Sequence, residues 1–324
     1  MTHGVSAQSS SQDKAPPCNA TSVLEELDLK NRPRLEQILA EAARVANAQA
    51  VLWKIEKDNL APSYLFGTVH VIDESMQTLS PAVRRAIASS KVIAVEAAQP
   101  ASKEAWQASM ADANPLMVSL DRELERVLDE HEMSVVERAL IAAGYPGRMA
   151  FALKPWAATM FLADSPCQHS LQERGLMPID AIIVERAENN NLPIVGLETT
   201  LEQYQSLASI PSALQVAWLK ASIELHPRVD DISETMAQLY RFRRLDAVWS
   251  LTQIMAPQAG LTDDMLQSLR SELVGKRNAR MLERALPLLD KGGAFIAVGA
   301  MHQIGPEGLV ALLKQKGFST VAIE

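Results

Sequence analysis

Two histidines of this 324-residue chain lie in the same short motif, a glycine followed three positions later by a histidine. The motifs are Gly67-Thr-Val-His70 and Gly299-Ala-Met-His302, and each follows an apolar run typical of a strand. A glycine at a strand end lets the backbone turn or approach a ligand closely. Two imidazoles beside carboxylates can bind a divalent metal ion or act as an acid–base pair.

The two motifs also share their surroundings. Each is followed by a proline that opens a helix, Pro81 or Pro306, and then by an apolar strand that ends in glutamate, Glu96 or Glu324. This pattern predicts a diverged internal duplication, in which Glu324 is a relic of the repeat. If both motif strands lie in one sheet, the histidines lie side by side at its carboxyl edge, where open α/β sheets bind ligands. Glu198 ends another apolar strand and would reach the same edge.

Strand and helix patterns alternate along the chain. A hairpin is expected at 50–67, and short apolar strands are expected at 92–96, 193–198, 294–298 and 319–323, with helices between them. We predict an α/β fold with a mainly parallel central sheet, built from two diverged β-GxxH-α-β repeats. A large helical insertion is expected at about 102–290, within a single domain of residues 31–324. Residues 1–30 are expected to form a disordered tail.

The composition excludes several classes of protein. Hydrophobic residues make up 48% and charged residues 22% of the chain, which are ordinary values for a globular protein. The net charge of −8 and the aromatic content of 5% argue against a nucleic-acid-binding protein. No apolar run approaches the ~20 residues that a membrane-spanning helix needs. The oligomeric state is left open.

The two cysteines, Cys18 and Cys167, form no CxxC pair, which argues against a zinc knuckle. The first 20 residues contain no apolar core of a signal peptide, but Val5-Ser6-Ala7 has the small-x-small form that precedes a signal cleavage site. We expect a periplasmic or secreted protein, with a cytoplasmic location as the alternative. In an exported protein, a Cys18–Cys167 disulfide and two free thiols are equally open.

At these residues the sequence resembles the TraB/GumN family. That family is related to the Tiki metalloproteases and to a superfamily with erythromycin-esterase-like hydrolases and haem-binding ChaN-like proteins. The resemblance covers about 50–324 and is looser over 205–270. It rests on LWKIEKDNLAPSYLFGTVHVI, VIAVEA, KPWAATM, GLMPIDAIIVERAENNNLPIVGLETTLEQ, VGKRNARML and FIAVGAMHQIGPEGLVALLKQKGFSTV, which occur in the order of the family's motifs.

The resemblance implies functional residues one by one. The matching positions are His70 and His302 for the paired histidines, Glu96 for the glutamate after the first helix, Glu198 for the LET glutamate, Gln203 for the glutamine after it, Arg277 and Asn278 for the RN pair, and Asp180 for the GxD aspartate. The match of Asp180 is weaker, because Met177-Pro178-Ile179 separates it from Leu176. The KPW segment that begins at Lys154 is expected to be structural.

The resemblance favours a divalent-metal-dependent hydrolase, most of all a peptidase, acting on a peptide or a small molecule. His70 and His302, with Glu96 or Glu198, would hold one ion of zinc, manganese or cobalt. The ion would lower the pKa of a bound water towards ~7, and the remaining glutamate would act as general base. Gly67 and Gly299 would have structural roles.

Two further residues have expected roles in this site. Arg277 would stabilise an oxyanion or hold a glutamate ionised, and Asn278 would orient its neighbours by hydrogen bonds. The alternative for Arg277 is a surface position in a short basic run. Two alternative functions are also open: a metal-independent His/Glu hydrolase like the esterase relatives, and a non-catalytic protein that binds a peptide or haem.

Overall fold

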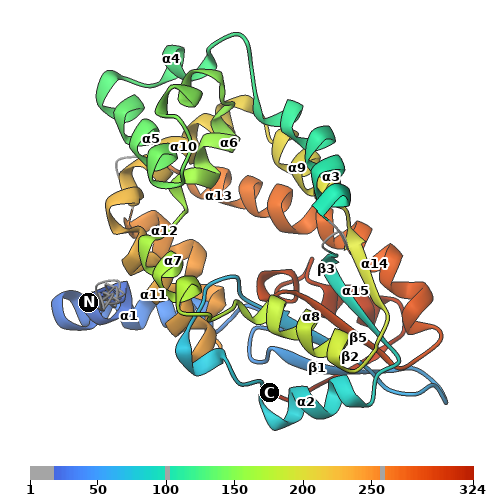
Figure 1. Ribbon diagram of the computed structural model, residues 1–324. Helices are drawn as coiled ribbons and strands as arrows, with labels where there is room; N and C mark the ends of the chain where they lie inside the picture. The colour runs from blue at the N-terminus through green and yellow to red at the C-terminus, as the bar shows by residue number, and fades with distance from the viewer. Residues whose placement is uncertain (1–17, 99–102, 256–259) are drawn as a thin grey trace, which may run out of the picture.

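A computed structural model describes residues 18–98, 103–255 and 260–324 (Figure 1). The first 17 residues of the expected tail, with the Val5-Ser6-Ala7 pattern, lie outside the described residues.

The described strands form one sheet in the order β4-β3-β5-β2-β1-β6. They are β1 (Leu52–Glu56), β2 (Ser63–Thr68), β3 (Val92–Ala97), β4 (Ile194–Glu198), β5 (Ala294–Gly299) and β6 (Ser319–Ala322). Strand β1 pairs antiparallel with β2 and β6, and the other pairs are parallel. The sheet is therefore mainly parallel, as predicted, and β1 and β2 form the expected hairpin.

The two GxxH strands are neighbours. Strand β5 lies between β2 and β3, and the register pairs Thr68 with Gly299 and Gly67 with Val298. On the other side of β5, Val95 pairs with Ala297. Both motifs and the strand that carries Glu96 therefore end at the same edge of the sheet.

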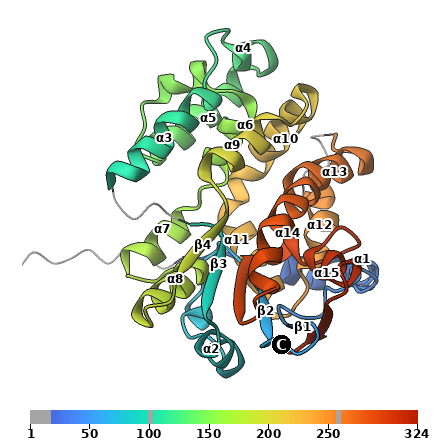
Figure 2. The same ribbon diagram turned by 90° about the vertical axis from the view of Figure 1, so that its right-hand side faces the viewer.

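Helices cover both faces of this sheet, as Figure 2 shows. Helices α2 (Pro81–Ala88) and α8 (Ile179–Asn189) lie on one face, and α14 (Lys276–Leu289) and α15 (Leu309–Gln315) lie on the other. Strand β5 serves both layers, because alternate residues point to opposite faces. Phe295 and Ala297 pack with the first pair of helices, and Ile296 and Val298 pack with the second.

The helices of the insertion lie above and beside the carboxyl edge (Figure 1). They are α3 (Lys103–Met117), α4 (Glu123–Val127), α5 (Glu130–Ala142), α6 (Pro155–Leu162), α7 (Pro166–Glu173), α9 (Thr200–Ala208), α10 (Ser212–Leu225), α11 (Val229–Arg241), α12 (Val248–Met255) and α13 (Asp263–Arg270). Within the range 102–290, α8, β4 and α14 belong to the sheet and its covering layers, so the insertion is interrupted once, by α8 and β4, and ends before α14. Its largest core contains the fully buried Trp156 of the KPW segment.

Helix α1 (Val23–Ala42) occupies part of the expected tail, so the prediction of disorder is wrong for 23–30. Ser22 caps the helix by accepting a hydrogen bond from the backbone N–H of Leu24, and the side chains of Val23 and Leu24 are buried. These two apolar residues follow directly on a polar, Pro-containing stretch, and they begin the helix within the range expected to be a tail.

Cys18 and Cys167 form a disulfide that links residues 149 positions apart. The bond joins the segment before α1 to α7, and it settles the choice between a disulfide and two thiols. Among the described residues, no helix is both long and apolar enough to cross a membrane.

Candidate active site

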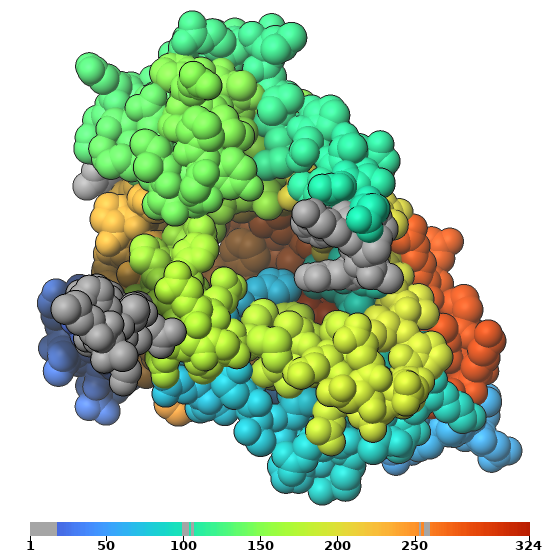
Figure 3. Space-filling view, in the orientation of Figure 1, coloured from blue at the N-terminus to red at the C-terminus, as the bar shows by residue number. Residues whose placement is uncertain are grey.

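The carboxyl ends of β2, β3, β4 and β5 face the insertion helices. In the space-filling view of Figure 3 the molecule is hollowed between these helices and the segment of α7 and α8 below them. The predicted site residues come from the loops and helices that surround this edge.

His302 is buried in η7 (Ala300–His302), a 3₁₀-helix that follows β5 directly. Its Nδ1 lies 2.7 Å from Oδ1 of Asn278, and Nδ2 of Asn278 donates to the carbonyl oxygen of Glu307 at 2.7 Å. Because an amide oxygen only accepts, Nδ1 carries the proton and Nε2 keeps its lone pair. Burial lowers the pKa of His302 to about 4, so the ring is neutral at pH 7.

Glu96 accepts hydrogen bonds from three elements. Its Oε2 accepts from the backbone N–H of Gly299 at 3.0 Å, and Oε1 accepts from Nε2 of Gln203 at 3.1 Å and from Arg277. Burial alone would raise the pKa of Glu96, but His302, Arg277 and the Gly299 N–H together lower it to about 2. Glu96 is therefore ionised at neutral pH, and its Oε2 lies 3.8 Å from Nε2 of His302.

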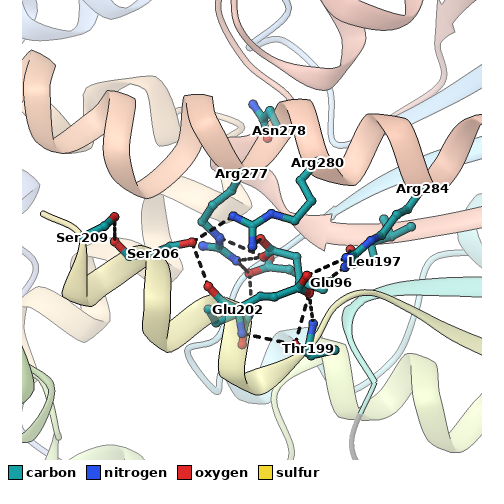
Figure 4. A network of polar contacts seen from close by, with 12 residues as sticks. Glu96, Leu197, Thr199, Glu202, Ser206, Ser209, Arg277, Asn278, Arg280 and Arg284 are labelled. Carbon is teal, nitrogen blue, oxygen red and sulfur yellow. Dashed lines mark hydrogen bonds and ion pairs between the residues drawn. The ribbon is translucent and has the colours of Figure 1, made fainter. Parts of the chain in front are cut away.

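Arg277, in the first turn of α14, joins the two predicted glutamates, Glu96 and Glu198. Figure 4 shows Arg277 beside Glu96. Its Nε and Nη2 donate to Oε2 of Glu198 at 2.9 and 2.5 Å, and Nη2 also donates to Oε1 of Glu96. The Arg277 side chain is 14% exposed, so the surface alternative for Arg277 is wrong. Burial would lower the pKa of Arg277, but the two carboxylates raise it above its usual value. The guanidinium is a fixed cation at the base of the site.

Glu198 lies behind Arg277, and none of its side chain is exposed. Its Oε1 has no hydrogen-bond partner among the described residues, and Nη1 of Arg280 lies 3.6 Å away. The structure therefore brings Glu198 to the arginine and away from solvent.

His70 lies just beyond β2, and 73% of its side chain is exposed. Its Nδ1 lies 3.0 Å from Oδ2 of Asp180, and Oδ1 of Asp180 accepts a hydrogen bond from the hydroxyl of Thr68. The hydrogen bond to Asp180 raises the pKa of His70 to about 9, which outweighs the partial loss of hydration around the ring. The charge of Glu96 also raises the pKa of His70, and the charge of Arg277 lowers it.

Of the two motif glycines, Gly67 is the one that close packing requires, because a Cβ on Gly299 would make only ordinary contacts. A Cβ on Gly67 would lie 2.7 Å from Oε1 of Gln303 and 2.8 Å from Cβ of Ala300, which is too close for any side chain. A Cβ on Gly299 would lie 3.4 Å from Oε2 of Glu96. The hydroxyl of Tyr240 donates to the carbonyl oxygen of Gly67 at 2.7 Å and supports this strand end from α11.

Residues 51–322 match the model of the TraB/PrgY/gumN family. The chain belongs to this family. The match covers the sheet, the insertion and every predicted catalytic and metal-binding residue, so the resemblance seen in the sequence is confirmed.

Three curated relatives of this TraB/PrgY/gumN-family chain are metalloproteases by name. Metalloprotease TIKI2 of Danio rerio is 25% identical over 319 residues, covering 82% of this chain and 60% of the relative. A Metalloprotease TIKI homolog of Nematostella vectensis is 23% identical over 49% of this chain and 38% of the relative, and Metalloprotease TIKI1 of Homo sapiens is 24% identical over 49% and 36%. The chain thus spans between about a third and three fifths of these relatives. No solved structure matches it.

The donor atoms of this TraB/PrgY/gumN-family site suit a metal in their chemistry. Metal-binding histidines commonly donate one ring N–H to an oxygen acceptor and bind the ion through the other nitrogen. His302 and His70 have this arrangement, with Asn278 and Asp180 as the acceptors of Nδ1. No group of three His, Cys, Asp or Glu side chains that could hold a metal ion is present among the described residues. The donors therefore fit a metal, although the structure does not gather three of them.

Several residues around the site have no signal in a single sequence. Thr68 and Tyr240 are ordinary residues at a strand end and in an amphipathic helix, and only the fold shows that they hold Asp180 and Gly67. A cavity of about 280 Å³ is lined by Tyr240, Phe66, Ser80 and Glu324 among others. None of the predicted catalytic or metal-binding residues lines it. Glu324 accepts from Ser80 and Arg243 there, away from Glu96.

Proposed function

We propose that the chain is a divalent-metal-dependent hydrolase, in the first place a peptidase, with His70, His302 and Glu96 as the residues that would hold the ion. The observation that carries the proposal is the matched hydrogen bonding of the two histidines, because an oxygen acceptor on a helix that covers the sheet holds each Nδ1. Nε2 of His302 keeps its lone pair, and Nε2 of His70 would give up its proton when a metal ion binds. The metalloprotease names of the relatives support the same class of chemistry.

When bound, a divalent ion of zinc, manganese or cobalt would supply a Lewis acid for a substrate carbonyl and a water of lowered pKa. The residues of the chain have separate tasks. His302 contributes a neutral ring with its lone pair on Nε2, and Glu96 contributes an ionised carboxylate. Asn278 keeps the proton of His302 on Nδ1, and Asp180 does the same for His70.

Arg277 and Glu198 have a supporting role in this proposal. Arg277 holds the Glu96 carboxylate in place and keeps it ionised, and Glu198 balances the buried guanidinium charge. The complete burial of Glu198 disfavours it as general base, so its sequence-based role is revised within the proposal. Glu198 is the counter-ion of Arg277, and Glu96, near His302, is the carboxylate that would bind the ion.

A metal-independent hydrolase is the second candidate, and the His70–Asp180 pair favours it. A histidine with a pKa of about 9 is protonated on both ring nitrogens at neutral pH, and it can donate the proton on Nε2 to a leaving group. The third alternative, a non-catalytic protein that binds a peptide or haem, remains a prediction.

An exported location is proposed from the Cys18–Cys167 disulfide, which suits an oxidising compartment.

Purified protein would be tested for hydrolysis of a peptide library, before and after treatment with a chelator and after return of zinc, manganese or cobalt. The proposal expects chelation to abolish hydrolysis and one of the ions to restore it. The variant H302A should be inactive, and H131A, at an exposed histidine of α5, should keep wild-type activity. Full activity of metal-free protein would favour the second candidate, and stoichiometric peptide or haem binding without turnover would favour the third.

A further inference from the structure

Two glutamines join the segment that carries His70 to the segment that carries Asp180. Oε1 of Gln168, in α7, accepts from the backbone N–H of Ile72 at 2.5 Å, and its Nε2 donates to the carbonyl oxygen of Ile72 at 3.1 Å. In the opposite direction, Oε1 of Gln77 accepts from the backbone N–H of Met177 at 3.0 Å, and its Nε2 donates to the carbonyl oxygen of Met177 at 2.9 Å. Each segment thus binds the backbone of one residue of the other segment through two hydrogen bonds.

This bonding needs a primary amide. The side chain must accept from an N–H and donate to a C=O of the same residue, as a neighbouring β-strand would, and Gln and Asn are the side chains that carry both groups in one plane. Ile72 is buried, so its backbone polar groups need partners that water does not readily provide. A glutamate at position 168 or 77 would keep the shape and the acceptor but lose the donor.

The two hydrogen bonds that each glutamine makes to one backbone residue form a clamp, and each clamp lies close in sequence to one residue of the His70–Asp180 pair. Ile72 follows His70 by two residues, and Met177 precedes Asp180 by three. Met177 also begins the stretch by which this chain departs from the spacing of the GxD pattern. The clamp from Gln77 therefore binds the part of the chain that positions Asp180 beside His70.

Helix α7 is itself anchored. Cys167, the neighbour of Gln168, is bonded to Cys18, and its backbone N–H donates to Oδ1 of Asp230 at 3.0 Å. The hydroxyl of Ser165, which caps α7, donates to the same oxygen at 2.5 Å. Gln168 consequently reaches Ile72 from a fixed support.

We propose that Gln77 and Gln168 are positioning residues, which set the separation of His70 and Asp180 and thereby hold Nε2 of His70 toward the site. The claim that the glutamines position His70 does not depend on the proposed function, whereas the expected effect on turnover rests on it. The glutamines touch no reacting atom, so they act through the two segments that they connect.

The test uses the variants Q168E and Q77E in the full-length protein freed of metal. The control is Q172E, which makes the same change at an exposed glutamine of α7, one turn from Gln168. Hydrogen exchange of the Ile72 and Met177 amides reports each clamp. The downfield Nδ1 proton of His70 in NMR spectra, assigned by its loss in H70A, reports the hydrogen bond to Asp180. Circular dichroism confirms that each variant is folded.

We expect exchange at the clamped amide to rise about tenfold, the usual effect of losing one intramolecular hydrogen bond, and the His70 proton signal to weaken or shift in both variants but not in Q172E. An unchanged His70 signal in a folded Q168E or Q77E protein would overturn the proposal. If one variant does not fold, the other decides, since each clamp is on a different segment.

Turnover separates this proposal from the proposed function. If wild-type protein hydrolyses peptides, both variants should lower kcat at least tenfold more than Q172E does, with a smaller effect on KM, because the substrate's binding groups are untouched. If wild-type protein hydrolyses nothing, the proposed function fails, and the exchange and NMR results still decide whether the glutamines position His70.

Discussion

Oδ1 of Asn278 lies 2.7 Å from Nδ1 of His302, and both side chains are buried. The amide of Asn278 cannot turn over, because its Nδ2 donates to the carbonyl oxygen of Glu307. A helix on one face of the sheet therefore decides which nitrogen of a histidine at the sheet edge keeps its lone pair. This relationship explains why an asparagine next to Arg277 belongs to the site although it has no acid–base chemistry of its own.

Replacing Asn278 with alanine should weaken both the fold and the site. N278A leaves the buried Nδ1 of His302 without an acceptor, which costs about 1–3 kcal/mol of unfolding free energy. Loss of such an outer partner also lowers metal affinity by roughly 10–100-fold. Urea denaturation and calorimetric titration with zinc would measure the two effects. The control N189A, at an exposed asparagine of α8, should change neither, and equal effects in both variants would contradict the assignment.

Replacing Arg277 with methionine should be more damaging. R277M leaves the carboxylates of Glu96 and Glu198 buried without their shared cation, and breaking a buried ion pair typically costs about 3–5 kcal/mol. R280M, one turn along the same helix, removes a 3.6 Å contact with Glu198 and a 3.1 Å hydrogen bond to the hydroxyl of Ser206, and it should cost less than R277M, about 1 kcal/mol. Urea denaturation of the two variants checks the difference, and similar losses would show that the bridge is not the source of stability.

The stability of metal-free protein should depend on pH through its two site histidines in opposite senses. Neutral His302 contributes stability that is complete above the unfolded pKa of 6.5 and is lost as the pH falls through about 4. Protonated His70 contributes stability that is complete below 6.5 and is lost as the pH rises through about 9.

The unfolding free energy, measured in urea between pH 4 and 10, would test this assignment. H302Q should flatten the acid side of the profile, and H70Q should flatten the alkaline side. An acid side that H302Q leaves unchanged would assign that dependence to other groups.

The disulfide between Cys18 and Cys167 should contribute to stability because it closes a long loop in the unfolded chain. C18S, C167S and the double variant should each lose about 2–4 kcal/mol of unfolding free energy, and the double variant should lose no more than either single one. Reductant should lower the stability of wild-type protein to the same level. Two titratable thiols in unreduced, denatured wild-type protein would contradict the bond.

The sequence predicts the sheet well because its strands are apolar runs separated by helical patterns, and these local signals agree with the final pairing. The repeat of GxxH predicts that His70 and His302 lie side by side, and their strands, β2 and β5, are indeed adjacent. The start of α1 is missed, because Val23 and Leu24 become buried only when they pack on α11.

The partners of the site residues are harder to predict. Asp180 reaches His70 across 110 positions, and Gln168 reaches Ile72 across 96. No periodicity or propensity connects such distant residues, so the hydrogen bonds follow from the way α7 and α8 pack beside the sheet edge. The burial of Glu198 behind Arg277 is likewise a result of packing, and the motif alone could not distinguish a base from a counter-ion.

Anomalous diffraction from crystals of active protein loaded with zinc or manganese would show whether a metal ion binds at the paired histidines. We predict a peak held by Nε2 of His302, the carboxylate of Glu96 and Nε2 of His70. We also predict that the variant H302A loses both this peak and peptidase activity. Protein that hydrolyses peptides with no metal at these three side chains would contradict these predictions.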